Sequence, residues 1–229
     1  MLRAHLEKTN RAARRRLIHL TWAALAATAG SGCSAVTTQY TKAGYDPAAP
    51  DAVKRIAVIG MAPEGHGPLA TLLAQVATDR INLKMNYLIY YTGTLPDAAG
   101  PGDGAWVEAC QQREGILSLR AMDVRTGEGP DVKMVIWASL RRCTDGEILW
   151  SAEAQDATES EDENLENMIK SYVQTLGPDV SAYAAASFLI VRDILNTLPD
   201  PTLTDDEILE KIELGHLPPP ADHRSYVRL

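Results

Sequence analysis

The chain has 229 residues, 45% of them hydrophobic, and a formal net charge of −8 from 22 Lys and Arg against 30 Asp and Glu. This length is enough for one domain with a buried core. The acidic balance repels phosphate backbones, so we expect no nucleic-acid partner.

Residues 1–32 have the layout of a secretory signal peptide. Six basic residues and one acid fall within the first 16 positions, and Leu17 to Ala29 carries no formal charge. Crossing a bilayer takes about 20 apolar residues, so this stretch is too short for a permanent membrane span. Removal of residues 1–32 leaves 16 basic against 29 acidic residues, a net charge near −13. Arg14-Arg15-Arg16 leaves open whether export uses the general or the twin-arginine route.

Cys33 is predicted to be a lipid anchor. The stretch Gly30-Ser31-Gly32-Cys33 resembles a bacterial lipobox, in which the cysteine is lipidated and becomes the first residue of the mature chain. Gly30 stands where Leu or Val is usual, and Ala27-Thr28-Ala29 is a competing site for simple secretion. Ser34 replaces the Asp of an inner-membrane signal, so the resemblance implies the periplasmic face of the outer membrane. The acidic chain would then reach the membrane through acyl chains alone.

Residues 33–52 are predicted to be a lipid-anchored tether because they are rich in Ala, Thr and Pro and lack a strong period. A flexible tether of this length reaches about 25 Å. Beyond Cys33, the mature chain holds only Cys110 and Cys143. Export to an oxidising compartment favours a disulfide between them, and two buried thiols are the alternative.

The domain is predicted to begin with a βαβ unit. Residues 54–60 form a short β-branched run closed by Gly, which is typical of a buried strand. Apolar residues then recur at helical spacing from Leu69, after Pro68, and residues 87–91 form a second strand. Such a unit is parallel and right-handed. Residues 106–113 could form a short helix that carries Cys110.

Three strands in succession follow, at residues 115–124, 132–141 and 147–155, with Asp145-Gly146 as a hairpin signal. Their alternation predicts an antiparallel meander with one face on the core. Helices follow at residues 165–176, 181–198 and 204–214, the first and last opened by the capping boxes Ser160–Glu163 and Thr204–Glu207. We therefore predict a single α/β domain over residues 53–214, with a mixed sheet in two or three layers. Residues 215–229 are predicted to be a flexible Pro-rich tail.

The order of these elements resembles the small α/β domain of several envelope lipoproteins. These include the curli-secretion lipoprotein and the lipoprotein activators of penicillin-binding proteins. The resemblance lies in residues 55–58 and in Asp145 to Ala152. Residues 183–188 and 198–201 are similar to an uncharacterised lipoprotein family of myxobacteria and leptospires. The resemblance implies a fold and a location in the cell envelope, without catalytic residues or a cofactor.

The loop after the first strand is the candidate ligand site, defined by Gly60, Met61, His66 and Gly67. Loops beyond the carboxyl ends of strands bind ligands in open α/β sheets. The Gly65-His66-Gly67 pattern lacks the third Gly of the dinucleotide fingerprint, so an ordinary surface loop is the favoured interpretation. We find no catalytic motif and no metal-binding motif in the mature chain, and His216 and His223 fall in the expected tail.

Trp137 falls on the polar face of its strand and, if exposed, would offer a docking patch, although core packing is the favoured role of the tryptophans.

Taken together, these features of the sequence predict an exported lipoprotein acting as a non-catalytic binding or assembly module with an envelope protein partner. A periplasmic enzyme or small-ligand-binding protein that uses the loops after the first two strands is one alternative. A secretion-type subunit that oligomerises through the edge of the meander is another.

Overall fold

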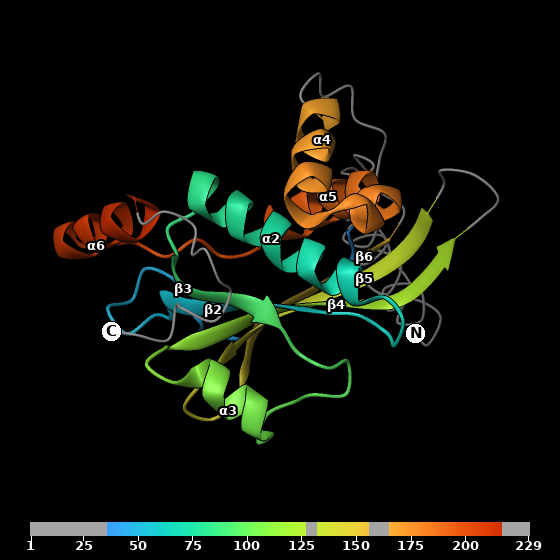
Figure 1. Cartoon of the computed structure of the whole chain (residues 1–229). Helices are drawn as coiled ribbons and strands as arrows, with labels where there is room; N and C mark the ends of the chain where they lie inside the picture. The colour runs from blue at the N-terminus through green and yellow to red at the C-terminus, as the bar shows by residue number, and fades with distance from the viewer. Residues whose placement is uncertain (1–35, 127–131, 156–164, 217–229) are drawn as a thin grey trace, which may run out of the picture. The chain divides into compact units, whose positions relative to one another are not determined.

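The structure is a computed structural model, and it describes residues 36–126, 132–155 and 165–216 (Figure 1). These residues form a mixed α/β fold in which six strands make one sheet, in the order β1-β6-β5-β4-β2-β3. The strands are β1 (Val36–Thr41), β2 (Arg55–Met61), β3 (Leu88–Thr94), β4 (Gly115–Thr126), β5 (Val132–Arg142) and β6 (Ile148–Gln155). The α-helices are α2 (Gly67–Lys84), α3 (Gly104–Cys110), α4 (Leu165–Leu176), α5 (Ser181–Leu195) and α6 (Asp205–His216). The predicted fold class is confirmed.

The predicted βαβ unit is present, since β2 and β3 are parallel neighbours joined by α2. The chain then returns across β2, so that β4 is parallel to β2 on its other side. Two right-handed crossovers that run in opposite directions place their helices on opposite faces of a sheet. Accordingly, Figure 1 shows α2 on one face of the sheet and α3 on the other. This part of the sheet therefore lies within three layers.

Each face of the sheet has its own core. The larger core joins α2 and α5 to the sheet and contains fully buried Leu73, Leu117 and Trp150. The smaller core lies under α3 and contains Ile59 and Trp106. Both tryptophans therefore serve in packing, as the sequence favoured.

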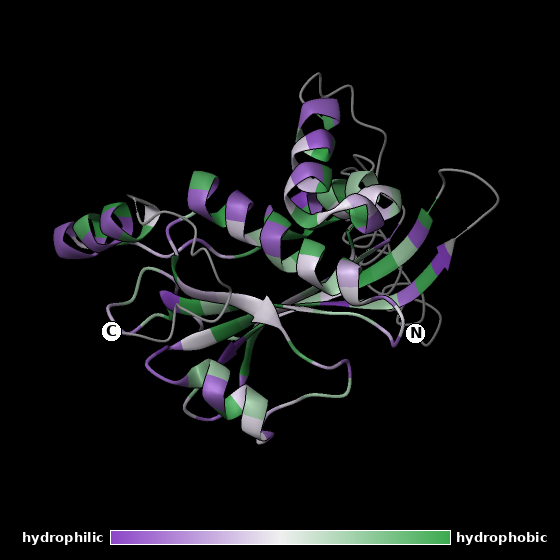
Figure 2. Ribbon diagram, viewed as in Figure 1, coloured by the Kyte–Doolittle hydropathy of each residue, from purple (hydrophilic) through white to green (hydrophobic). Residues whose placement is uncertain are grey.

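The antiparallel meander of β4, β5 and β6 is confirmed. Figure 2 shows hydrophobic and hydrophilic residues alternating along the ends of β4 and β5. Gly146 in the predicted hairpin has φ 71°, a left-handed conformation that suits Gly. Trp137 is half-buried on the face away from α5, and the Arg141 guanidinium lies 5.9 Å from its ring centroid.

The prediction of a tether over residues 33–52 is wrong for its described part. Strand β1 pairs antiparallel with β6 and so forms an edge of the sheet. The Lys42 backbone N–H also donates to the Leu149 carbonyl at 2.9 Å. Without β1, strand β6 would present a row of unpaired backbone groups, and the Val- and Thr-containing segment supplies the missing partners. The predicted free edge of the meander is therefore covered, and β1, which has an irregular register between Val36 and Thr38, is the edge instead.

The C-terminal helices follow the prediction closely. The capping box at residues 204–207 is formed, with the Thr204 N–H donating to Glu207 Oε2 at 2.8 Å. Helix α6 continues to His216, two residues past the predicted domain end. Among the described residues, no helix is long and apolar enough to cross a bilayer. The signal peptide, Cys33, the Ser160–Glu163 capping box and most of the predicted tail lie outside the described residues.

Candidate functional site

Two residues of the predicted ligand loop have structural roles. Gly60 lies where α2 crosses β2, and a Cβ atom there would sit 1.8 Å from the Ala70 carbonyl oxygen. Met61 is 1% exposed and belongs to the smaller core. The glycine thus permits close packing of helix and strand, and the methionine fills the space on the other face.

The other two loop residues mark the start of α2. The His66 Nδ1 atom lies 3.1 Å from the Tyr183 hydroxyl, so the ring joins the start of α2 to α5. Gly67 is the first residue of α2 and has open space around its Cα. The four residues are therefore neighbours in the chain with different roles in the described structure.

Cys110 and Cys143 form the predicted disulfide, with 5.5 Å between their Cα atoms. The bond joins the end of α3 to the turn after β5. Among the described residues, no three His, Cys, Asp or Glu side chains are placed to hold a metal ion. An open pocket of about 160 Å³ lies at the far end of the β4–β5 pair, and we return to its residues below.

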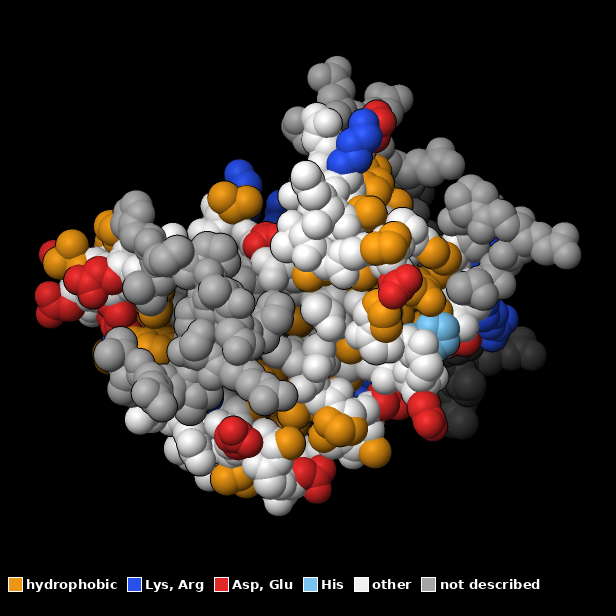
Figure 3. Space-filling model, in the orientation of Figure 1, with side chains coloured by type: hydrophobic (Ala, Val, Ile, Leu, Met, Phe, Trp, Pro, Cys, Tyr) orange, Lys and Arg blue, Asp and Glu red, His pale blue; other side chains and the backbone are white. Residues whose placement is uncertain are grey.

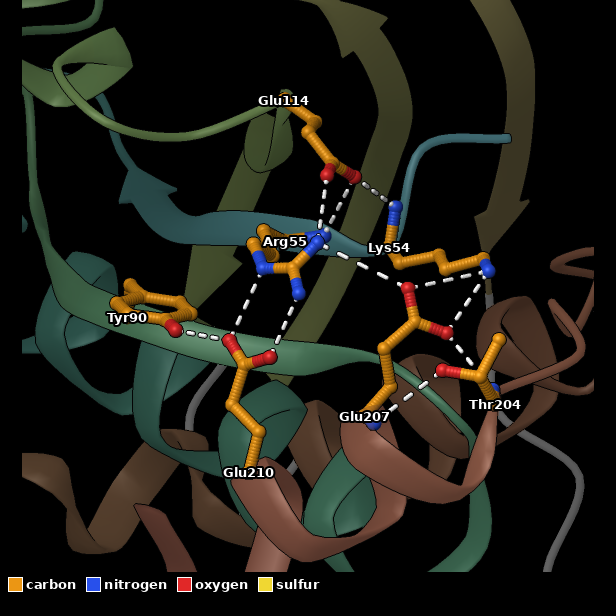
Figure 4. Close-up of polar contacts among 7 residues, drawn as sticks. All are labelled: Lys54, Arg55, Tyr90, Glu114, Thr204, Glu207 and Glu210. Carbon is orange, nitrogen blue, oxygen red and sulfur yellow. Dashed lines mark hydrogen bonds and ion pairs between the residues drawn. The ribbon is translucent and has the colours of Figure 1, made fainter. Parts of the chain in front are cut away.

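The most developed polar cluster in the described part of the chain holds α6 against the start of β2 (Figure 4). Lys54 is 4% exposed, and its Nζ lies 2.9 Å from Glu207 Oε2 on the first turn of α6. A buried ammonium without a carboxylate partner would be strongly destabilising, so this ion pair fixes where α6 begins.

Arg55 makes the second connection to α6. Its Nε and Nη2 atoms donate to the two carboxylate oxygens of Glu210 at 2.9 and 2.6 Å, a bidentate arrangement. Its Nη1 atom donates to Glu114 at 2.9 Å, and Glu114 Oε2 accepts the backbone N–H groups of Lys54 and Arg55. The Tyr90 hydroxyl on β3 also donates to Glu210.

In this cluster the pKa values of the two α6 carboxylates, Glu207 and Glu210, are lowered, and the pKa values of Arg55 and Tyr90 are raised. The hydrogen bonds from the Thr204 backbone N–H and from Lys54 lower the pKa of Glu207. The guanidinium of Arg55 lowers the pKa of Glu210, and Glu210 in turn raises the pKa of Arg55. Burial, together with the hydrogen bond to Glu210, raises the pKa of Tyr90. Both carboxylates are therefore held in the charged form in which they bind α6 to the sheet.

The opposite face of α6 is apolar and exposed. Ile208, Leu209 and Ile212 are 45%, 59% and 49% exposed, and they are three of the seven large hydrophobic side chains exposed among the described residues. Exposed Asp205, Asp206 and Glu213 lie on the same helix. Figure 3 shows hydrophobic and acidic side chains together on this part of the surface. We call these six residues the α6 surface.

An isolated amphipathic helix would be expected to turn its apolar stripe toward the core. Helix α6 does the reverse, because Lys54 and Arg55 occupy the surface on which it docks and require carboxylate partners. The sequence predicts Glu207 only as a member of the Thr204–Glu207 capping box, and it gives no sign of the ion pair with Lys54. The basic pair Lys54-Arg55 at the start of the first predicted strand was the visible signal, but nothing in the sequence connects it to a helix about 150 residues later.

No protein-family model matches the sequence, and no curated protein matches it. Solved structures with a similar arrangement include a PelC dodecamer from Paraburkholderia phytofirmans, at 12% identity and a TM-score of 0.42, covering 69% of this chain and 93% of that chain. The lipoprotein GNA1162 from Neisseria meningitidis is similar at 16% identity and a TM-score of 0.31, covering 53% and 96%. The hypothetical protein CT253 from Chlamydia trachomatis is similar at 9% identity and a TM-score of 0.31, covering 58% and 99%. At these values the similarities carry no argument about the function or any single residue of this chain.

Proposed function

We propose that this chain is an exported lipoprotein, anchored through Cys33 to the periplasmic face of the bacterial outer membrane, and that it acts there as a non-catalytic binding or assembly module. The observation that carries the binding role is the α6 surface. A helix that is held by ion pairs and presents its apolar residues outward leaves apolar area in water, and a partner would remove that area from water.

The chemistry of the α6 surface defines the partner. Ile208, Leu209 and Ile212 have the spacing by which an amphipathic helix enters an apolar groove. The acids beside them favour a groove bordered by Lys and Arg side chains. The same acids would repel one another if two copies met through this surface. We therefore assign the α6 surface to a different protein of the envelope, one with a basic-bordered apolar groove.

The anchor is supported by two independent features. The Gly30-Ser31-Gly32-Cys33 sequence follows an export signal, and the mature chain is too acidic to bind anionic headgroups through net charge. The Cys110–Cys143 disulfide suits an oxidising compartment outside the cytoplasm. The anchor is tested with Cys33→Ala, which should abolish palmitate labelling and release the protein from the membrane fraction. Continued attachment of this variant would refute the anchor.

The partner is tested by placing a photocrosslinking amino acid at Leu209 in cells, with Val107 as the control. Val107 is 53% exposed on α3, so its crosslinker is equally accessible but lies away from α6. We expect a discrete product from Leu209 alone, and we expect it to be lost when Asp206→Asn and Glu213→Gln are combined. A product made of two copies of this chain, or the same products from both positions, would contradict the proposal.

A further inference from the structure

We infer that the end of the sheet at which β1 begins faces the bilayer, and that Arg125 and Lys133 at the end of the β4–β5 pair contact phospholipid headgroups. This inference rests on the proposed lipid anchor at Cys33. We call these two residues the hairpin end.

The first step is the reach of the anchor. Only Ser34 and Ala35 separate Cys33 from Val36, the first residue of β1. Three residues span at most about 11 Å even when fully extended. A flexible tether over residues 33–52 would have allowed about 25 Å. Because β1 is part of the sheet, a lipidated Cys33 holds the folded domain against the membrane surface.

The second step is the register of the strands. Val36 lies opposite Ala154, which lies opposite Ile136, so these residues mark the level at which β1 begins. Strand β5 extends four residues beyond that level, from Val135 to Val132, and pairs there with β4. Lys133 and its partner Arg125 lie three residues past Ile136, which at about 3.3 Å per residue is about 10 Å past the start of β1. A membrane surface within about 11 Å of Val36 on this side of the sheet would therefore lie at the level of Lys133 and Arg125.

The third step is the chemistry of the hairpin end. The Arg125 side chain is 77% exposed and pairs with Asp123 at 2.7 Å. Met122, at the level at which β1 begins, is 55% exposed. Lys133 is exposed, and no ion pair of Lys133 is found among the described residues. An open pocket of about 160 Å³ lies here, lined by Asp123, Arg125, Lys133, Met134, Val135 and Gln155. Cations near headgroup phosphates, with an apolar side chain beside them, suit the interfacial region of a bilayer.

This orientation also separates the two proposed binding surfaces. The ion pairs that hold α6 lie at the start of β2, where Ile56 pairs with Gly115, and Gly115 pairs with Arg142. These residues form the end of the sheet opposite to the hairpin end. The α6 surface is therefore at the end of the sheet away from the bilayer, where a second protein can reach it.

The test uses the lipidated full-length mature protein in vesicles of phosphatidylethanolamine and phosphatidylglycerol that contain brominated lipids. A fluorophore is attached to Lys133→Cys, to Arg125→Cys, or to Ala48→Cys as the control. Ala48 is exposed in the loop that follows the other end of β1. A fourth protein combines labelled Lys133→Cys with a flexible Gly-Ser linker of about 20 residues inserted between Ser34 and Ala35, which restores a reach of about 25 Å.

We expect lipid quenching at positions 125 and 133, no quenching at position 48, and loss of quenching with the long linker. Equal quenching at positions 48 and 133, or quenching that the linker leaves unchanged, would overturn the inference. Flotation of the vesicles reports the anchor separately. If the protein floats and only the quenching pattern fails, the orientation is wrong and the lipid anchor stands. If Cys33 is not required for flotation, both are wrong.

Discussion

The buried ion pair between Lys54 and Glu207 offers the sharpest test of how α6 is held. We consider Glu207→Gln, which removes one charge and changes the shape of the side chain little. The amide oxygen can still accept the Thr204 N–H of the capping box, since Gln serves at this position as Glu does. The substitution therefore removes the carboxylate charge together with the hydrogen bond that Oε1 accepts from Lys54 Nζ at 3.2 Å.

The size of the effect follows from burial. Removing one member of a fully buried ion pair costs about 3 to 5 kcal/mol because the other charge is left without a partner. The Lys54 side chain is 5% exposed and the Glu207 side chain is 13% exposed, so the pair is nearly but not fully buried. The remaining amide oxygen still accepts a hydrogen bond from Nζ. We therefore expect a loss of about 2 kcal/mol, equivalent to about 30-fold in the docking equilibrium of α6.

Native-state hydrogen exchange measures this loss of docking free energy separately for α6 and for the core. Helix α6 packs at the side of the domain, so its backbone amides should report local opening and those of β2 and α2 the opening of the core. Glu207→Gln should speed exchange in α6 by about 30-fold and leave the core amides unchanged. The matched control is Glu213→Gln on the exposed side of the same helix, which should change little. Equal protection of α6 in the wild type and in Glu207→Gln would refute the assignment of the ion pair as the main contact.

Three further predictions concern acid, packing and the disulfide. Docking of α6 lowers the pKa values of Glu207 and Glu210. The stability that these two carboxylates contribute is therefore complete above the ordinary Glu pKa of about 4.3 and is lost as the pH falls through the lowered values. Hydrogen exchange of the α6 amides should accordingly become faster below about pH 4, and this acceleration should be smaller in Glu207→Gln. Gly60→Ala should destabilise the protein by about 3 kcal/mol or more in urea unfolding, because its Cβ would overlap the Ala70 carbonyl, and the control Gly67→Ala should be near neutral. The double variant Cys110→Ser and Cys143→Ser should lose about 3 to 4 kcal/mol of unfolding free energy, because the disulfide closes a loop between cysteines that are 33 residues apart. An unchanged unfolding midpoint would contradict a formed disulfide.

The order and type of most elements could be predicted because their signals are local. The β-branched run at residues 54–60, the helical spacing after Pro68 and the Asp145-Gly146 turn each report the conformation of their own segment. The disulfide could be predicted as well, since Cys110 and Cys143 are the two cysteines beyond Cys33 and a predicted export signal favours an oxidising compartment. These predictions needed no knowledge of which segments meet in space.

The prediction that failed concerns a segment whose environment is supplied from elsewhere. Residues 36–41 carry a weak period and form a strand only because β6, more than 100 residues later, leaves one edge unpaired. The loop at residues 60–67 was a candidate ligand site for which an ordinary surface loop was the favoured interpretation, and the close approach of α2 to Gly60 adds a packing role that the sequence did not indicate.

The sequence by itself determined an acidic α/β chain with a predicted export signal, a lipobox-like cysteine and one pair of further cysteines, because composition and local patterns carry that information. Only the tertiary structure decided that the sheet begins at Val36 and which way α6 turns. Both depend on contacts between residues far apart in the chain, β1 with β6 and Lys54 and Arg55 with Glu207 and Glu210. Such pairings are set by complementary charge and by unpaired backbone groups across the fold, and no local pattern reports them.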